Sequence, residues 1–310
     1  MLRAPVLAFA LLAAPSLAFA FGTTHSLGQD AEHERIVRAA LPDLGPRTLD
    51  ELAGRRGTFG AVGAPDNPLR GLMSEHAAHC DGGDFLASPP APPGYPQTEA
   101  QAAAILTDCR DWIVRWIDAA VAAAAPLAQP TAAEARLQCS YEGEPERAKC
   151  AVLEYMGLAF HAAQDFYSHA NWVDQPAPGA VSARNPPGLG YSERAPWLDP
   201  RLDAPFPVGL ISGCYEGFPE RMYCRYDGSA RVRHSALSKD TGPIGAAGAT
   251  GPGTTDRGSI NGNFERAVAA AIEDTRDKWR YFEERVIAVY GEEAGLRIIC
   301  TVRHDDYRAC

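Results

Sequence analysis

The chain has 310 residues, of which 46% are hydrophobic and 22% are charged, enough for one large domain or two small ones. Its formal net charge of −10 at pH 7 argues against a protein that binds nucleic-acid backbones through a basic surface. The same charge does not exclude an enzyme that meets phosphate through metal ions, because the charge of such ions is absent from a count of side chains.

Residues 1–20 have the pattern of a cleaved export signal. Arg3 supplies a positive charge, residues 6–14 form an apolar core, and Ala18-Phe19-Ala20 gives a small-x-small cleavage site. The apolar core is short for a membrane span, and no later segment reaches the roughly eighteen apolar residues that a span needs. We therefore expect a signal peptide at 1–20, a mature chain that starts at Phe21, no transmembrane segment, and a secreted or periplasmic location.

All eight cysteines follow the signal, and an even number in an exported protein indicates disulfide bonds. Sequence alone leaves the connectivity open. A cysteine zinc site is the weaker interpretation, because the chain contains no C-x-x-C pair. Three local pairs suggest themselves and leave a fourth: Cys139–Cys150, Cys214–Cys224 and Cys300–Cys310, with Cys80–Cys109 remaining.

Four segments have the apolar spacing of helices with one buried face. The first begins near Asp30 and ends before Pro42 and Gly45. The second begins at Thr98, a suitable N-cap, the third covers residues 153–173, and the fourth runs from Asn263 to Tyr290. The side chains expected to point inward are Ile36, Val37, Ala40 and Leu41 in the first helix, Ile105, Cys109, Trp112, Trp116, Ala119 and Ala120 in the second, and Phe264, Ala267, Ala271, Ile272, Trp279 and Phe282 in the fourth.

The segments between these helices are rich in Gly and Pro and contain no strand-rich region. We expect 42–98 to be mostly irregular and 174–213 to be an ordered but irregular insertion. Residues 242–253, GPIGAAGATGPG, have a collagen-like period, but four triplets are too few for a triple helix, so a flexible loop is predicted. The expected fold class is all-α: a single mostly helical domain over 21–310 with long, irregular, disulfide-tied loops.

The segment 153–173 carries the most informative polar residues. His161, Asp165 and His169 follow one another at steps of four, which keeps all three near one face of a helix. Neighbours such as Phe160 and Phe166 indicate that this helix is buried, although three unrelated residues on a solvent face would have the same spacing. Buried imidazoles and a carboxylate need compensation, and a metal ion supplies it.

Further candidate ligands lie outside that helix. Asp66 precedes Asn-Pro, a position that also favours turns through local hydrogen bonds. The segment HAAHCDGGDF brings several polar residues close together, and within it His76 competes with His79 as a ligand. His25 and His304 have no evident partners and are interpreted as surface residues. The remaining candidates are His33 in the first helix, and His234 and Asp240 in RVRHSALSKD.

These motifs resemble the zinc-dependent phospholipase C and S1/P1 nuclease superfamily, and most closely its Het-C and CinY-type branch. The resemblance extends from residue 21 to residue 240, and its most specific part is H-x3-D-x3-H followed by A-N-W-V. The segments that carry it are FG at the predicted mature start, HERIVRAAL, GAPD, AHCDGGDF, HAAQDFYSHANWV and HSALSKD.

The resemblance implies a mostly helical fold of the zinc phospholipase C type with two or three zinc ions in a cleft. Asp66 would either ligate an ion or act as the general base on the attacking water. Asp165 would bridge two ions, and Phe21 stands where enzymes of the superfamily generally carry Trp. The implied ligand sets are Phe21 (backbone amine and carbonyl), His33 and Asp165 for one ion; Asp66, His79, His161 and Asp165 for a second; and His169, His234 and Asp240 for a third.

The function expected from this resemblance is a secreted zinc-dependent phosphoesterase, phospholipase C-like, that hydrolyses a phosphodiester with metal-activated water. A phospholipid substrate would require peripheral membrane contact, to which residues 195–211 could contribute, although packing over the cleft is the simpler role for that loop. One alternative is an S1/P1-like nuclease, which needs base stacking and positive potential, so the acidic composition makes nucleic acid the less favoured substrate. Another is a non-catalytic Het-C-like recognition or toxin protein with structural metals.

Overall fold

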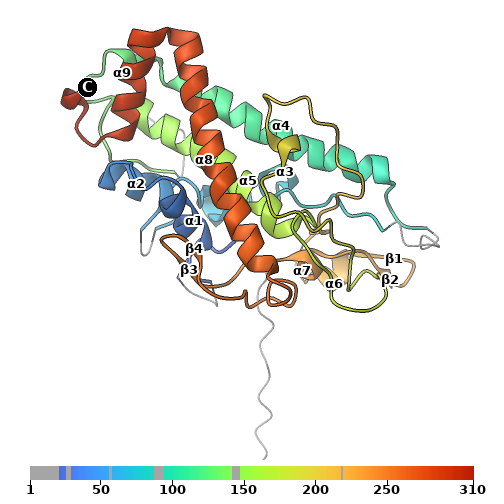
Figure 1. The fold of residues 1–310 in the computed structure, drawn as a ribbon. Coiled ribbons are helices and arrows are strands. Elements are labelled where there is room, and N and C mark those ends of the chain that lie inside the picture. Colours follow the sequence, from blue (N-terminus) through green and yellow to red (C-terminus); the bar gives the residue numbers. More distant parts are fainter. Residues whose placement is uncertain (1–20, 26–28, 56–57, 87–93, 142–146, 218) are drawn as a thin grey trace, which may run out of the picture.

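The computed structural model describes residues 21–25, 29–55, 58–86, 94–141, 147–217 and 219–310, so the predicted signal peptide lies outside the described residues. Within these ranges the chain is mostly helical, with nine α-helices and two two-stranded antiparallel sheets (Figure 1). The helices are α1 (Glu32–Ala40), α2 (Pro46–Ala53), α3 (His76–His79), α4 (Glu99–Ala123), α5 (Ala148–His169), α6 (Glu220–Tyr223), α7 (His234–Leu237), α8 (Asn263–Tyr290) and α9 (Glu292–Arg303). The strands are β1 (Arg225–Tyr226) with β2 (Ser229–Ala230), and β3 (Ile244–Gly245) with β4 (Gly248–Ala249).

The central helix is α5, and it is buried along its whole length apart from the half-buried Tyr155. Its main packing partners are the long helices α4 and α8, and α8 crosses it in Figure 1. A helix without a solvent-facing side has to be covered along its whole length by other elements. The long helices α4 and α8 provide much of this cover. The helix predicted over 153–173 is thus confirmed as a buried helix, but it begins at Ala148 and ends at His169.

The helix α5 ends where the chain begins to pair with a distant segment. After His169, Asn171 exchanges hydrogen bonds with the backbone of Ile211, and its side-chain amide donates to the carbonyl of Gly209. These contacts leave His169 at the last turn of α5, beside the loops that follow it. The insertion 174–213 is irregular, as predicted, and contains one short 3-10 turn at Pro196–Leu198.

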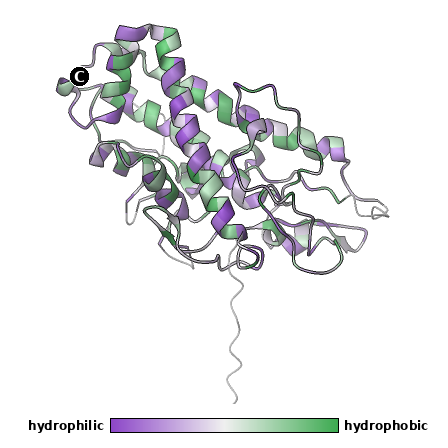
Figure 2. Cartoon of the chain, viewed as in Figure 1, coloured by the Kyte–Doolittle hydropathy of each residue, from purple (hydrophilic) through white to green (hydrophobic). Residues whose placement is uncertain are grey.

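The helices α4 and α8 form the covering layer. Thr98 caps α4 through a capping box with Gln101, in agreement with the predicted start. Every residue predicted to point inward from α8 is buried, and Figure 2 shows hydrophilic and hydrophobic residues alternating along this helix. The α4 prediction is confirmed in part: Cys109, Trp112 and Ala120 are buried, whereas Ile105, Trp116 and Ala119 are only half-buried, although Trp116 still packs against the core.

The described part of 42–98 is mostly irregular, as predicted, although it also contains α2 and α3. One loop prediction was wrong. The glycine-rich segment 242–253 is a β3–β4 hairpin instead of a flexible loop. Gly242 and Gly253 pack directly on the ring of Phe264, where a Cβ would lie 2.6 and 2.9 Å from ring or side-chain atoms, so these glycines serve close packing.

Four disulfide bonds join the pairs that the sequence suggested: Cys80–Cys109, Cys139–Cys150, Cys214–Cys224 and Cys300–Cys310. Four such bonds fit an oxidising, extracellular compartment. Among the described residues, no helix is both long and apolar enough to cross a membrane.

Candidate metal centre

The predicted ligands converge on the C-terminal half of α5. His161, Asp165 and His169 come from α5 itself and are fully or almost fully buried. The other elements that meet them are α1, the 3-10 turn at Ala64–Asp66, the end of α3, and α7 with the residues after it. They contribute His33, Asp66, His79, His234 and Asp240, all of which are buried or at the border of burial.

Asp165 lies at the middle of one half of this cluster. Its Oδ1 is 3.2 Å from Nε2 of His33, whereas its Oδ2 is 3.0 Å from Nε2 of His161 and 3.1 Å from Nδ1 of His79. Asp66 is more distant, with Oδ1 3.9 Å from the same two nitrogens of His79 and His161. The two oxygens of Asp165 therefore face different histidines, as a carboxylate that bridges two ions would.

Each histidine in this half is held from its far side. Nδ1 of His33 donates to Gln164 at 2.7 Å, Nδ1 of His161 donates to the carbonyl of Val62 at 2.8 Å, and Nε2 of His79 donates to the carbonyl of Leu72 at 3.3 Å. These tautomers are assigned from the hydrogen bonds. In these tautomers the ring nitrogens that face the cluster carry lone pairs. Two such nitrogens, Nδ1 of His79 and Nε2 of His161, are only 3.1 Å apart.

Asp240 lies between the two histidines of the other half. Its Oδ1 is 3.2 Å from Nε2 of His169, and its Oδ2 is 3.3 Å from Nε2 of His234. The far nitrogens are again anchored: Nδ1 of His169 donates to the carbonyl of His79 at 2.8 Å, and Nδ1 of His234 faces a carboxylate oxygen of Glu220 at 3.3 Å. Metal-binding histidines are typically oriented in this way by a hydrogen bond from the second ring nitrogen.

Sequence reasoning missed Asp81 as a possible ligand. Side-chain donor atoms form three groups within 4.8 Å of one another: His33, His161 and Asp165; Asp66, His79 and His161; and Asp81, His169 and His234. Oδ1 of Asp81 is 3.4 Å from Nδ1 of His169. The signal available in the sequence was its place two residues after His79 in AHCDGGDF. Glu220 and Gln164, which orient His234 and His33, had no comparable local signal.

Buried polar atoms without hydrogen-bond partners indicate whether these residues are suited to hold metal ions. Within the described residues, several side-chain atoms of the cluster have no hydrogen-bond partner although each is shielded from solvent. Buried polar atoms without partners are destabilising, and a cation at the centre of each group would compensate them. These atoms are Nε2 of His33, Oδ2 of Asp66, Oδ1 of Asp81, Oδ1 of Asp165, and Nε2 of His169 and of His234.

The electrostatics of the cluster also favour cations. Burial would lower the pKa of His234, but Asp81 and Asp240 raise it to about 10. Burial would likewise lower the pKa of His169, but Asp81, Asp165 and Asp240 hold it well above its usual value. Burial would raise the pKa of Asp165, yet His161, His169 and His33 keep it well below its usual range. A field strong enough to shift these groups attracts any positive charge.

The predicted mature start lies against the same cluster. Phe21 is fully buried, with its ring 5.8 Å from that of His33 and 6.5 Å from that of Phe264. The carbonyl of Gly22 accepts from the amide of His33 at 3.1 Å, and the amide of Gly22 donates to the carbonyl of Asp240 at 3.4 Å. The backbone of Gly22 is therefore hydrogen-bonded to the backbone of His33 and of Asp240, one candidate ligand from each half.

Other residues considered from the sequence do not join the cluster. His76 lines a separate small pocket with Glu75 and Gly82 and belongs to none of the three groups, so His79 is the histidine of that segment that does. Asp84 pairs with Arg231. The partly exposed His25 lies 3.6 Å from Asp30, away from the cluster residues. His304 also belongs to none of the three groups.

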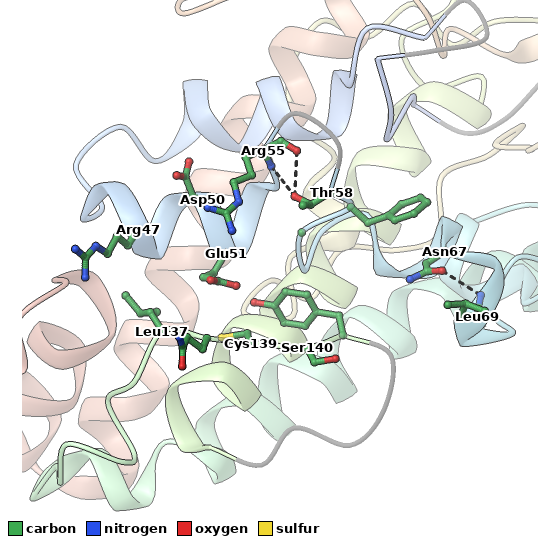
Figure 3. A pocket seen from close by; sticks show the side chains of 14 residues that line it. Arg47, Asp50, Glu51, Arg55, Thr58, Asn67, Leu69, Leu137, Cys139 and Ser140 are labelled. Atoms are coloured by element: carbon green, nitrogen blue, oxygen red, sulfur yellow. Dashed lines mark hydrogen bonds between the residues drawn. The ribbon is translucent and has the colours of Figure 1, made fainter.

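A cavity of about 880 Å³ lies outside the cluster, between α2 and residues 137–141 (Figure 3). It contains none of the predicted ligands, although Asn67 on its wall follows Asp66 directly. Arg47, Asp50, Glu51 and Arg55 supply charges of both signs, so no single ligand charge is selected.

Comparison of the chain with protein-family models, with curated proteins and with solved structures found no match in any of the three.

Proposed function

We propose that this protein is an exported zinc-dependent phosphoesterase with the fold and ligand set of the zinc-dependent phospholipase C and S1/P1 nuclease superfamily, which its motifs resemble. The observation that supports this most is the meeting of imidazoles and carboxylates whose unpartnered nitrogen and oxygen atoms face one another in one buried cluster. Mixed imidazole and carboxylate donors are the ligands of hydrolytic zinc sites.

The chain's own residues would hold two or three ions. Zinc in such a site polarises a phosphoryl oxygen and lowers the pKa of a bound water toward about 7. The proposed holders are His33 and Asp165 with the backbone amine and carbonyl of Phe21; Asp66, His79, His161 and Asp165; and His169, His234 and Asp240. Because an amine can ligate only when it is free, this arrangement requires removal of residues 1–20.

Asp66 is the residue we assign to proton transfer. It lies at the edge of the cluster, 9% exposed, and its Oδ2 has no hydrogen-bond partner among the described residues. A carboxylate at this position can accept a proton from a water that attacks phosphorus while its other oxygen remains near His79 and His161.

The substrate we propose is a phosphodiester of the phospholipid class. The net charge of −10 disfavours extended contact with nucleic acid. In the loop 195–211, Trp197 and Leu198 are buried and pack on the core, but Leu202 and Val208 are 43% and 88% exposed. Those two side chains would be the part of the loop that meets a lipid surface.

The test uses purified protein that begins at Phe21. It is incubated with bis(p-nitrophenyl) phosphate, with phosphatidylcholine vesicles and with single-stranded DNA, each with and without EDTA. We expect hydrolysis of the first two substrates that EDTA abolishes, and faster cleavage of DNA than of vesicles would favour the nuclease alternative. Hydrolysis that is insensitive to EDTA, or its absence in a zinc-loaded protein, would contradict the proposal.

A variant pair separates catalytic from structural metal. His161→Ala removes a fully buried cluster residue, and His25→Ala removes a partly exposed histidine outside the cluster. We expect the first variant to remain folded and to lose hydrolysis, and the second to keep it. A His161→Ala chain that unfolds, together with an inactive wild-type protein, would favour a non-catalytic protein with structural metals.

A further inference from the structure

We propose that a buried ion pair, Lys239 with Asp174, positions Asp240 as a metal ligand. This inference rests on the proposed metal centre, because it assigns positioning residues to one of the proposed ions. Nζ of Lys239 lies 2.7 Å from Oδ1 of Asp174, and both side chains are fully buried. A buried ion pair is costly to desolvate and is strongly destabilising when one partner is removed, so its neighbours in the fold indicate its role.

The ammonium group of Lys239 joins the ends of two helices that carry candidate ligands. It donates to the carbonyl of Ala170, the C-cap residue of α5, at 3.1 Å, and to the carbonyl of Leu237, the last residue of α7, at 2.6 Å. The last carbonyls of a helix lack partners within the helix, and a cation is favourable there. Since α5 carries His169 and α7 carries His234, one ammonium group holds together the helices of both histidines.

The backbone of Lys239 connects this arrangement to Asp240. The amide of Lys239 donates to Oγ of Ser168 at 3.2 Å, and that hydroxyl donates to Oδ1 of Asp240. Ser238, which precedes Lys239, donates to Oδ2 of Asp240. The same two carboxylate oxygens face Nε2 of the two histidines at 3.2 and 3.3 Å. The orientation of the Asp240 carboxylate therefore depends on where Lys239 lies against α5.

Asp174 is itself held from a third direction. Its Oδ2 accepts from Nε of Arg257 at 2.8 Å, and Nη2 of Arg257 donates to the carbonyl of Pro186 at 2.9 Å. Both oxygens of Asp174 thus face a cation, and the ion pair is tied to the insertion 174–213. Residues that orient a ligand in this way typically change metal affinity about 10- to 100-fold when they are lost.

The experiment compares Lys239→Met with Lys149→Met. Lys149 is also a buried lysine that donates to a backbone carbonyl, that of His304, but it lies in the first turn of α5, whereas the candidate ligands lie in the C-terminal half of this helix. Both variants should lose thermal stability. Competition with a chromophoric chelator should show one zinc ion bound about 10- to 100-fold more weakly in Lys239→Met, and wild-type affinities in Lys149→Met.

The sign of this effect separates positioning from simple electrostatics. Removing the positive charge of Lys239 would by itself strengthen the binding of a nearby cation, so weaker binding reports lost geometry. Asp174→Asn gives a second readout, should Lys239→Met not fold. The visible absorption bands of cobalt depend on the geometry of its ligands, and one set of bands should change in cobalt-substituted Asp174→Asn.

Two results would overturn the inference. One is wild-type zinc affinity in a folded Lys239→Met protein, and the other is a wild-type cobalt spectrum in Asp174→Asn. A wild-type protein that binds no zinc would instead overturn the proposed function.

Discussion

Individual side chains in the cluster are oriented by hydrogen bonds on the side away from the proposed ions. The ring of His33 depends on Gln164, whose own amide nitrogen donates to Thr275 at 3.0 Å. Thr275 in turn donates to the carbonyl of Ala271 on α8. This chain of hydrogen bonds connects the histidine of α1 through α5 to α8, so the tautomer of His33 is fixed by residues that would never touch an ion.

Replacing Gln164 by Leu therefore tests orientation without removing a ligand. The substitution leaves Nδ1 of His33 without its acceptor, and we expect zinc affinity to fall about 10- to 100-fold, the usual effect of losing such a partner. Competition with a chromophoric chelator measures the affinity. Gln129→Leu, at an exposed position, is the control. Equal affinities in the two variants would show that Gln164 does not orient His33.

Asp66→Asn tests proton transfer at the edge of the site. The amide keeps the size of the side chain but cannot accept a proton from water, so kcat should fall by about 10²- to 10⁴-fold. Because Asp66 lies farther from His79 and His161 than Asp165 does, most of the bound metal should remain. Steady-state kinetics with bis(p-nitrophenyl) phosphate, together with elemental analysis, separates the two effects. Loss of metal in proportion to activity would make Asp66 chiefly a ligand.

At the scale of elements, α5 is the helix against which the loops of the site are positioned. Gly157 allows the segment that carries Val62 and Asp66 to approach it, because a Cβ at Gly157 would lie 2.4 Å from the backbone carbon of Ala61. The carbonyl of Val62 then reaches His161. The absence of a side chain at Gly157 thus determines how closely the segment with Val62 and Asp66 can approach α5.

The variant Gly157→Ala tests whether this close approach requires glycine. Helix propensity alone would stabilise the chain by about 1 kcal/mol. The close contact with Ala61 should outweigh that gain, so the free energy of unfolding should fall by about 1–3 kcal/mol in urea titrations, as overpacked cores generally show. An increase in stability would mean that the loop tolerates the methyl group without displacement.

The Cys80–Cys109 disulfide ties α4 to the segment that carries His79 and Asp81. Replacing both cysteines by Ser should lower the free energy of unfolding by about 2–4 kcal/mol and should also weaken zinc binding. The double Ser variant of Cys300–Cys310 is the control, because this bond closes a loop at the end of α9 that contributes no residue to the cluster. Chelator competition measures the zinc affinity of the two double Ser variants. Similar affinities would contradict the proposal that the Cys80–Cys109 bond positions His79 for zinc binding.

Local periodicity predicted α1, α5 and α8 well, because their apolar residues repeat along a buried face. It could not predict α2, whose first amides donate to the carboxylate of Asp305 at 3.0 and 2.9 Å, from the far end of the chain. The spacing on α5 and nearby motifs indicated candidate ligands, and the structure brings these residues together. Asp81 could not be distinguished from Asp84 in the sequence, because only the tertiary fold turns one toward His169 and the other toward Arg231.

At the scale of the whole molecule, the site is part of the interior. One hydrophobic cluster extends from Phe21 to Val302 and encloses α5, the helix that carries three of the candidate ligands. Asp81, Asp165 and Asp240 are buried beside it, with Asp66 at the edge, which is destabilising unless cations accompany them. Folding and metal binding should therefore be coupled in this protein.

Metal removal should consequently lower thermal stability. A ligand at a thousandfold excess over its dissociation constant stabilises the folded state by about 4 kcal/mol, so the EDTA-treated protein should unfold at a clearly lower temperature. Calorimetry of treated and zinc-reloaded samples measures the difference. Reloading should restore the original Tm, and a Tm that EDTA leaves unchanged would show that the cluster is stable without cations.

The central claim is that the buried cluster around Asp165 is a zinc centre completed by the freed amino terminus of Phe21. Elemental analysis of the purified mature protein, with N-terminal sequencing of the same sample, tests it most directly. We predict two or three zinc ions per chain and a sequence that begins Phe-Gly. A folded protein that begins at Phe21 and contains no zinc, even after zinc is supplied, would contradict the claim.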